Sequence, residues 1–390
     1  MIKRATLFLA LVLIPALVIP AAASAKRDPS GRYIVVLEDK HVKDPRSVAS
    51  EHRRKFDAKV KKVYRSALEG YVAEIRPGEL AALRADKRVA HVEPDRLMKA
   101  VATQTGATWG IDRIDQRALP LSGSFSYSNT GAGVKSYVID SGITPTHQEF
   151  AGRVAGVRDF VGVPGEPWHT DGVDCNGHGT HVSGTVAGTG YGVAKGASLV
   201  GVRVLDCEGY GFTSEIIAGV DWVTADHLAG EPAVANMSLG GGRSDALDSA
   251  VSRSIADGVS YAVAAGNGDW RGRAQDACKS SPARVPEALT ISATDTADRK
   301  ASWANYGSCV DWFAPGVGIT SAWHTSDSAA ATISGTSMAA PHSAGVAALY
   351  LQGSPGASPA SVRSALYNQT TKYIVSYANT TNRHLLHSGW

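Results

Sequence analysis

The stretch Ile333-Ser-Gly-Thr-Ser-Met-Ala-Ala-Pro-His342 is the part of the chain around which the rest is organised. Gly335 permits backbone angles that a side chain would forbid, and Thr336-Ser337 can cap a helix. The small apolar residues from 338 to 351 predict a helix buried on all sides. Ser337 would then stand at the positive end of that helix, beside backbone N–H groups without helical partners. These features make Ser337 a candidate nucleophile for acyl transfer, and the simplest alternative is a capped core helix.

Composition is ordinary for a globular protein, with 390 residues of which 44% are hydrophobic and 19% charged. Residues 1–25 differ from the rest, because two basic residues precede a short apolar run that ends at Ala23-Ser-Ala25. This order predicts a secretory signal peptide and hence a secreted, extracellular protein. Prolines interrupt the apolar run, and no later segment is long enough to span a bilayer, so we expect no membrane association.

Charge is distributed unevenly along the chain. Residues 26–101 carry 19 basic and 12 acidic side chains, a net charge of +7, whereas residues 102–390 carry 18 and 24, a net charge of −6. Opposite net charges favour attraction between the two segments. Nucleic-acid binding is the rival explanation of the basic segment, but acids alternate with its bases and aromatic residues are not interleaved. We therefore expect no nucleic-acid partner.

Four cysteines all lie in the second segment, where an exported protein can keep them oxidised. Three pairings are possible. We favour Cys175 with Cys207 and Cys278 with Cys309, because these bridges would staple two loops beside the candidate chemistry. A zinc site is the alternative, but no Cys-x-x-Cys pair is present to begin one.

Two patterns of predicted elements follow the signal. The first is β-α-β-β-α-β, typical of a small α+β ferredoxin-like domain, and a polar linker over residues 99–108 ends it. The second alternates apolar strands with helices, which predicts an α/β fold with a mainly parallel central sheet covered on both faces. The first pattern has strands at 33–37, 62–64, 71–75 and 89–93 and helices at 47–60 and 77–84; the second has strands at 136–139, 199–205, 233–237, 261–265 and 289–292 and helices at 178–187, 213–227, 245–257 and 338–351.

Polar residues suited to catalysis occur where the predicted strands end, which in parallel sheets is where the active crevice forms. Asp140 ends one strand, and Asn267 follows another. His178 begins a predicted helix between glycines that allow a tight turn and close packing. Its neighbour His181 is three residues away, so a metal pair is the alternative, but the glutamate and i, i+4 spacing of zinc-protease helices are missing.

Three segments together resemble the catalytic signatures of the subtilases, and especially the aqualysin-like members of the proteinase K group. They are Val138-Ile-Asp-Ser-Gly142, Gly177-His-Gly-Thr-His-Val-Ser-Gly184 and Gly335-Thr-Ser-Met-Ala-Ala-Pro-His342. The chain order Asp, His, Ser and the oxyanion asparagine are those known from subtilisin. No Gly-x-Ser-x-Gly motif occurs, which argues against an α/β-hydrolase.

The resemblance implies a subtilisin-like three-layer fold and a serine endopeptidase. Ser337 would be the nucleophile, His178 the general base and then acid, and Asp140 the group that orients the imidazole, with Asn267 in the oxyanion hole. His181 would be structural, as would His342. Substrates would lie as an extra strand between two edges, Gly209-Tyr210-Gly211 and Ser238-Leu239-Gly240. Gly268 adds no charge beside the primary pocket, so broad specificity with an apolar or aromatic residue before the cut is expected.

The resemblance also implies a self-processing precursor. Residues 26–101 are similar to the inhibitory and folding-assistant propeptide of the family, and residues 102–390 would be the catalytic domain, with the junction near Val101–Ala102. We expect a monomer whose partners are protein and peptide substrates and its own propeptide.

Structural calcium, with no catalytic cofactor, is the last implication. Asp311 and the carbonyls of Pro286 and Ala288 match one calcium site of the proteinase K group. A second site matches Asp112, Asp115 and Gln116, with Ser122 and Ser124 as further ligands. Without the resemblance these acids would be interpreted as solvated side chains or helix caps.

Two other functions remain open on the same residues. One is a secreted binding or inhibitory protein on a subtilase scaffold that has lost catalysis, which the complete set of four candidate residues argues against. The other is an esterase that uses the same triad.

Overall fold

The structure is a computed structural model that describes residues 31–38, 42, 44–66, 68–95, 102–162, 165–166 and 169–390. The chain divides into two compact units, 1–99 and 100–390, and each is described by itself. The predicted signal peptide and Val101 of the predicted junction lie outside the described residues. None of the described helices is long and apolar enough to cross a membrane.

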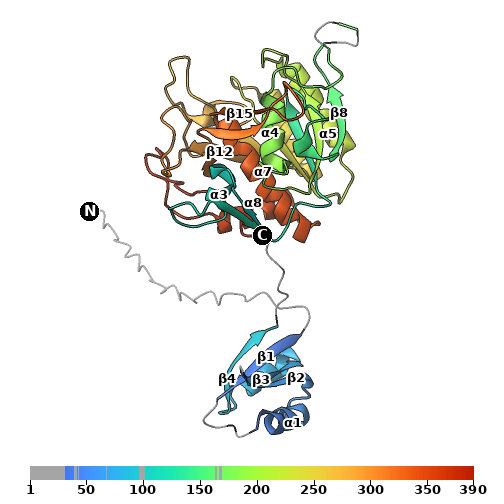
Figure 1. Ribbon diagram of the computed structural model, residues 1–390, viewed down its shortest axis with the longest axis vertical. Helices are drawn as coiled ribbons and strands as arrows, with labels where there is room; N and C mark the ends of the chain where they lie inside the picture. Colours follow the sequence, from blue (N-terminus) through green and yellow to red (C-terminus); the bar gives the residue numbers. More distant parts are fainter. Residues whose placement is uncertain are drawn as a thin grey trace, which may run out of the picture. The chain divides into compact units, whose positions relative to one another are not determined.

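The first unit is a four-stranded antiparallel sheet with the strand order β2-β3-β1-β4, packed against helices (Figure 1). This is the order of a ferredoxin-like α+β domain, so that prediction is confirmed. Its core includes Val35, Tyr71 and Leu83, all fully buried. Its elements are β1 (Arg32–Leu37), α1 (Pro45–Lys55), β2 (Lys59–Arg65), β3 (Glu69–Glu74), η2 (Pro77–Glu79), α2 (Leu80–Arg84) and β4 (Val89–Pro94).

One helix of this unit is shorter than predicted. The sequence pattern placed a helix over 47–60, but α1 ends at Lys55 and β2 begins at Lys59. Phe56 turns into the core, and Asp57 takes a left-handed backbone conformation with φ of 49°. A left-handed residue cannot continue a right-handed helix, so the extension to residue 60 was wrong.

The second unit is built on a seven-stranded parallel sheet with the order β13-β12-β11-β10-β7-β9-β8. The predicted α/β class and mainly parallel sheet are thereby confirmed. Its elements are β5 (Ala102–Thr105), α3 (Trp109–Ile114), β6 (Ser124–Tyr127), β7 (Lys135–Asp140), η3 (Gln148–Phe150), β8 (Val154–Asp159), α4 (His178–Ala187), β9 (Ser198–Arg203), α5 (Thr213–Asp226), β10 (Ala233–Met237), α6 (Asp245–Asp257), β11 (Ser260–Ala264), η4 (Ala277–Lys279), β12 (Leu289–Thr294), β13 (Trp312–Pro315), β14 (Ile319–Ala322), β15 (Ala330–Ile333), α7 (Thr336–Gly353) and α8 (Pro359–Gln369).

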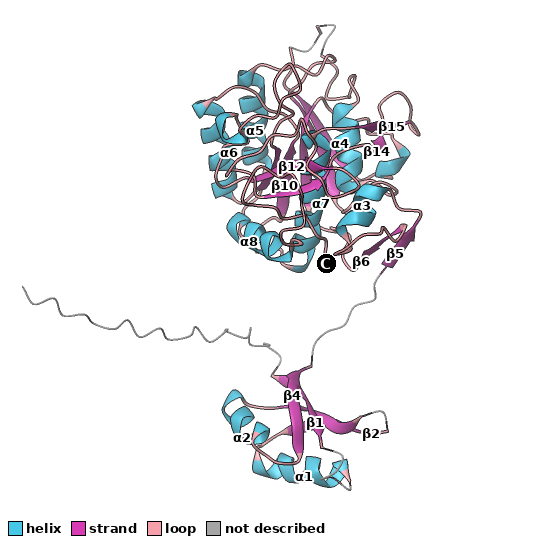
Figure 2. Ribbon diagram, turned by 90° about the vertical axis from the view of Figure 1, so that its left-hand side faces the viewer, coloured by secondary structure: helices cyan, strands magenta, loops and turns pink. Residues whose placement is uncertain are grey.

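Three layers follow from the alternation of side chains along each strand. On β7, Val138 packs into the core beneath α4 and α7, whereas its neighbours Tyr137 and Ile139 pack into the core beneath α5 and α6. Figure 2 shows the two helix groups on opposite sides of the sheet. Helix α7 is buried almost throughout, as the small apolar sequence predicted.

The edge strands β8 and β13 were not predicted from the sequence. Both lie at the ends of the sheet, and β8 has no fully buried residue. The continuous apolar run that marks the central strands is therefore missing from β8, whereas β13 is fully buried but has only four residues. The hairpins β5–β6 and β14–β15 were not predicted either, and each of their strands has only four residues.

Two disulfides, Cys175–Cys207 and Cys278–Cys309, confirm the favoured pairing. They join residues 32 and 31 positions apart. Loops of this length correspond to roughly 3 kcal/mol of stabilisation each in the chain-entropy model.

Candidate active site

Three neighbouring strands end at one edge of the sheet and carry polar groups there. Asp140 is the last residue of β7, Ser238 follows β10, and Asn267 follows β11 by three residues. Because β7, β10 and β11 are adjacent and parallel, their carboxyl ends meet. Two helices begin at the same edge: His178 is the first residue of α4, and Ser337 the second of α7.

Asp140 and His178 are in direct contact. His178 Nδ1 lies 2.7 Å from Asp140 Oδ1, which also accepts a hydrogen bond from the Ser141 N–H. The Asp140 side chain is fully buried, whereas that of His178 is 24% exposed. Burial alone lowers the pKa of His178, but the charge and hydrogen bond of Asp140 outweigh it and raise the pKa above its ordinary value. This carboxylate therefore favours the protonated imidazole.

The start of α4 is fixed by Asp174, a residue that the sequence did not single out for a role. Its Oδ1 accepts from the N–H groups of Asn176 and Gly177, and its Oδ2 from the Thr180 N–H at 2.8 Å. It thus satisfies donors that the helix leaves without partners. The Ser141 hydroxyl also donates to it, at 2.9 Å, which connects the β7 end to the α4 start. An aspartate shortly before a helix start is the sequence signal that could have indicated this cap.

Small residues let α4 approach the β7 end. A Cβ atom at Gly179 would lie 2.1 Å from the Gly142 carbonyl oxygen, so no side chain fits there. This close approach agrees with the tight packing predicted from the glycines around His178.

Ser337 is joined to the end of β10 by two hydrogen bonds. Its hydroxyl donates to the Ser238 carbonyl at 3.0 Å, and the Ser238 hydroxyl donates to the Ser337 carbonyl at 2.7 Å. Pro341, four residues into the helix from Ser337, has no N–H to offer that carbonyl. Ser238 therefore supplies the bond that the proline removes. The Ser337 hydroxyl has no hydrogen bond to His178 among the described residues.

Asn267 caps α7 from another strand. Its Oδ1 accepts from the Thr336 N–H at 2.8 Å and from the Thr336 hydroxyl at 2.9 Å. The prediction that Thr336 or Ser337 caps the helix was wrong, since Gly335 is the cap residue and makes no side-chain bond. With its oxygen engaged, Asn267 turns its Nδ2 the other way. The place of a Cβ atom on Gly335 lies 3.5 Å from both Asn267 Nδ2 and the Ser337 nitrogen, so these two donors lie close to one point.

Both predicted substrate edges line a single hollow of about 320 Å³ together with His178. Its wall includes all six predicted residues, Gly209, Tyr210, Gly211, Ser238, Leu239 and Gly240. A second hollow of about 340 Å³ shares Ser238, Leu239 and Gly240 and reaches Ser337 and Asn267. The histidine and the serine thus open onto two hollows that meet at one strand edge.

The second hollow has no charged side chain among its lining residues. Ala264, Ala265, Gly268 and Ala283 form part of its wall. Gly268 has a φ of 85°, and a Cβ atom there would lie 2.7 Å from the Arg273 carbonyl oxygen. Only glycine fits this position, so no side chain at residue 268 can add a charge to the wall.

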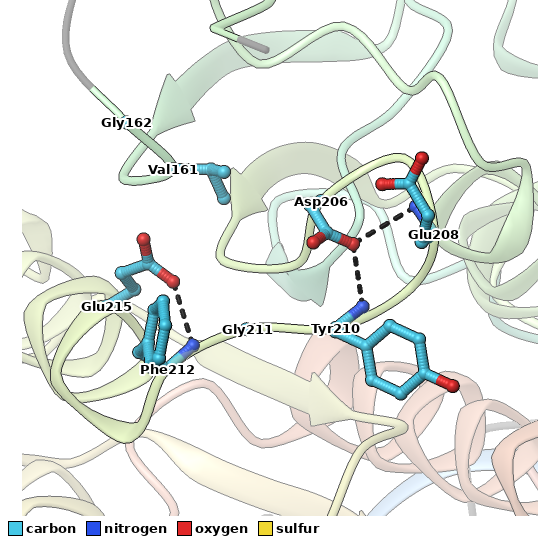
Figure 3. Close-up of a pocket in the computed structure, with 8 residues that line it drawn as sticks. All are labelled: Val161, Gly162, Asp206, Glu208, Tyr210, Gly211, Phe212 and Glu215. Carbon is cyan, nitrogen blue, oxygen red and sulfur yellow. Dashed lines mark hydrogen bonds between the residues drawn. The ribbon is translucent and has the colours of Figure 1, made fainter.

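A third hollow of about 490 Å³ continues from the first and shares Glu208, Tyr210 and Gly211 with it. Figure 3 shows Tyr210 and Phe212 beside it, with side chains of Asp206 and Glu215 that accept bonds from the loop backbone. Tyr210 is 75% exposed and Phe212 77% exposed. Large aromatic surfaces therefore lie beyond the residues nearest His178, at one of the two predicted substrate edges.

The two other histidines near the signatures have structural positions. His181 Nε2 lies 3.0 Å from the Ile319 carbonyl oxygen, and His342 Nδ1 lies 2.8 Å from that of Met338. Burial lowers the pKa of each to about 4, so both are neutral at pH 7. Within the described part of the chain no three His, Cys, Asp or Glu side chains gather as they would around a metal ion.

The second calcium site implied by the sequence fits the ion chemically. The Asp112 and Gln116 oxygens accept from the Ser122 N–H at 3.1 and 3.0 Å, and Asp115 Oδ2 accepts from the Ser126 N–H at 2.6 Å. Burial raises the pKa of Asp115, and the nearby charge of Asp112 adds to this rise. Two neighbouring carboxylates with amide and hydroxyl oxygens form the donor set that calcium prefers.

The first implied calcium site does not fit. Arg363 of α8 donates from Nε to Asp311 Oδ1 at 3.0 Å, and its two Nη groups donate to Asp311 Oδ1 and the Pro286 carbonyl. Two of the three ligands that the resemblance assigns to calcium are thus bound by a guanidinium. The assignment of calcium to Asp311, Pro286 and Ala288 therefore disagrees with the contacts present.

The chain matches two known protein families. Residues 131–388 match the Subtilase family, and residues 32–100 match Peptidase inhibitor I9. The chain is 54% identical over 329 residues to the extracellular serine proteinase of Thermus sp. strain Rt41A. The aligned region covers 84% of this chain and 77% of that protein. It is 48% identical over 339 residues to alkaline serine exoprotease A of Vibrio alginolyticus, covering 85% of this chain and 61% of that protein.

A solved structure, that of a cold adapted subtilisin-like serine proteinase, aligns with a TM-score of 0.68 and 51% identity, covering 73% of this chain and 99% of its own. The matched family region spans well over half of the sequence. The chain therefore belongs to the subtilase family of serine peptidases.

Proposed function

We propose that this chain is a secreted endopeptidase that cleaves proteins through Asp140, His178 and Ser337. His178 removes the proton from the Ser337 hydroxyl as Oγ attacks the scissile carbonyl, after the hydroxyl turns from Ser238 toward the imidazole. Asp140 stabilises the imidazolium that forms. The oxyanion is received by Asn267 Nδ2 and the Ser337 N–H.

The remaining steps return the enzyme to its starting state. The imidazolium gives its proton to the leaving amine as the peptide C–N bond breaks, which leaves an acyl group on Ser337 Oγ. Water then loses a proton to His178 and attacks the acyl carbon. The Oγ leaves with that proton, and the carboxylic acid product is released.

The nearness of Asn267 Nδ2 and the Ser337 nitrogen to one point beside Gly335 is the observation that carries this proposal. It can be tested by labelling with a fluorophosphonate probe, which needs an activated serine. We expect labelling of the native chain and none of Ser337→Ala. An unlabelled native chain would instead support a scaffold that has lost catalysis, and faster turnover of esters with no peptide cleavage would support an esterase.

The uncharged second hollow supports a preference for an apolar or aromatic residue before the cut. Peptides that differ only at that residue test this point. We expect kcat/KM to be highest for phenylalanine or leucine and lower for lysine and glutamate, since a buried charge would find no partner. A preference for glutamate or lysine would refute the assignment.

Residues 26–101 are proposed as an inhibitory propeptide that the catalytic domain, 102–390, removes from itself. The Peptidase inhibitor I9 match supports this role. In purified Ser337→Ala precursor the segment should stay attached, whereas the native chain should release it. Efficient removal in the alanine variant would show that another protease performs the cut.

Calcium at Asp112, Asp115 and Gln116 is proposed as a stabilising ion. It would neutralise two neighbouring carboxylates and hold α3 to the loop at Ser122. An ion that binds only the folded chain adds about 2.7 kcal/mol when it is a hundredfold above its Kd. Chelation should therefore shorten the half-life at raised temperature without an immediate change in the initial rate, and Asp115→Asn should remove most of this sensitivity.

A further inference from the structure

The turn before β12 and the start of β13 enclose a buried carboxylate that favours a positively charged partner. The Asp311 side chain, only 7% exposed, lies just before β13. Its Oδ2 accepts from the Thr290 N–H at 2.8 Å, which leaves Oδ1 directed toward the turn at Pro286. A carboxylate this deeply buried requires a charged or hydrogen-bonding partner.

Arg363 supplies that partner from a distant part of the chain. It is the fifth residue of α8, and its neighbours on the helix, Val362 and Leu366, are fully buried in the main core. These two residues fix the helix so that the Arg363 side chain reaches across to Asp311 and the Pro286 carbonyl. The contact is therefore built into the packing of α8.

A guanidinium and a calcium ion compete for the same oxygens at this place. Calcium takes six to eight oxygen ligands and needs the carboxylate and the carbonyls to face it directly. Arg363 occupies Asp311 Oδ1 with two of its donors and the Pro286 carbonyl with a third. A calcium ion bound beside Arg363 would be repelled by the positively charged guanidinium. Both cations would also have to share the single carboxylate of Asp311.

We propose that Arg363 replaces a structural cation in this chain, and that the place it fills is a calcium site which opens when Arg363 is removed. The guanidinium neutralises Asp311 permanently and ties α8 to the β12–β13 edge without a dissociable ion. Stability at this edge is therefore independent of calcium, in contrast to the site at Asp112 and Asp115.

The test measures bound calcium and thermal unfolding on the full chain carrying Ser337→Ala, which prevents self-digestion. The Ser337→Ala chain and the Ser337→Ala, Asp311→Asn chain should bind the same number of calcium ions. Adding Arg363→Ala should raise the number by one. It should also lower the unfolding midpoint in chelator, and millimolar calcium should restore it. The double change Arg363→Ala, Asp311→Asn should lose the added ion.

A matched control is Arg299→Ala, which removes a 58% exposed arginine that pairs with Asp295 in the same unit. It should leave the number of bound ions unchanged. Loss of one ion from Asp311→Asn alone would overturn the proposal, because calcium would then occupy the place beside Arg363. Failure of Arg363→Ala to gain an ion, or an equal gain in Arg299→Ala, would overturn it as well.

Discussion

At the scale of single residues, the two polar atoms of the Asn267 side chain have different roles. The oxygen makes structural hydrogen bonds, and the nitrogen is the proposed oxyanion donor. The oxygen of Asn267 accepts two hydrogen bonds from Thr336, and its nitrogen lies near the same point as the Ser337 nitrogen. The fold therefore orients the amide before any substrate arrives, which is the condition for strong oxyanion stabilisation.

Asn267→Asp tests this division because it keeps an oxygen for the Thr336 N–H and replaces the donor with an acceptor. We expect kcat to fall by about 10²–10³, a range measured for loss of such a donor in subtilisin itself, with little change in KM or unfolding temperature. Thr336→Val, which removes only one of the two bonds to the amide oxygen, should cost less. Equal activity of Asn267→Asp and the native chain would remove Asn267 from the site.

The proposed role of His178 as general base predicts the acidic limb of the pH profile. The reaction needs the neutral imidazole, so kcat/KM should rise as pH increases through the His178 pKa. Because Asp140 raises this pKa, the midpoint should lie above 6.5, the ordinary value for histidine. The profile of kcat/KM against pH on a neutral peptide measures it. A midpoint below 6.5 would show that burial, and not Asp140, dominates.

At the scale of elements, the buried pair of Asp159 and Arg203 joins the edge strand β8 to β9. Arg203 Nη1 lies 2.8 Å from Asp159 Oδ2, and both side chains are almost fully buried. Burial raises the pKa of Asp159, but N–H donors of the following loop and the charge of Arg203 outweigh it, so the pKa is lowered. The carboxylate is therefore stabilised in the folded chain.

Asp159→Asn should lower the free energy of unfolding by about 3–5 kcal/mol at pH 7, since it leaves Arg203 buried without its charge partner. A group with a depressed folded pKa contributes stability above its unfolded pKa of about 3.9 and loses it as pH falls through the folded value. The difference between variant and native chains should therefore shrink below pH 4. Denaturant unfolding of the Ser337→Ala chain measures it.

Asp295→Asn is the matched control, because its partner Arg299 is 58% exposed. Exposed pairs contribute between 0 and about 1 kcal/mol, so this change should have little effect. Comparable losses in both variants would mean that burial of the ion pair is not what holds β8 in place.

The sequence predicted those elements and site residues that are marked by a pattern among neighbouring positions. The central strands, the buried helix α7 and the positions of Asp140, His178 and Asn267 all follow local patterns. The contacts of Ser238 and Arg363 depend instead on residues far away in the chain. Arg363, for example, is 52 positions from Asp311, and no local pattern indicates their contact.

At the scale of the whole molecule, the two segments carry opposite net charge, +7 over 26–101 and −6 over 102–390. Opposite charges accelerate encounter and favour binding, and dissolved salt screens them. The screening length falls from about 10 Å at 0.1 M salt to about 3 Å at 1 M. The charge difference should therefore matter most at low ionic strength.

We expect the separate 26–101 fragment to inhibit the mature enzyme, with an inhibition constant that rises as salt increases from about 0.05 to 1 M. Three lysines on β2, Lys59, Lys61 and Lys62, are exposed, and changing all three to glutamine removes three positive charges with little cost to the fold. This fragment should show a smaller dependence on salt, mainly through slower association. An inhibition constant that does not change with salt would remove the electrostatic contribution, and absence of inhibition would remove the propeptide role itself.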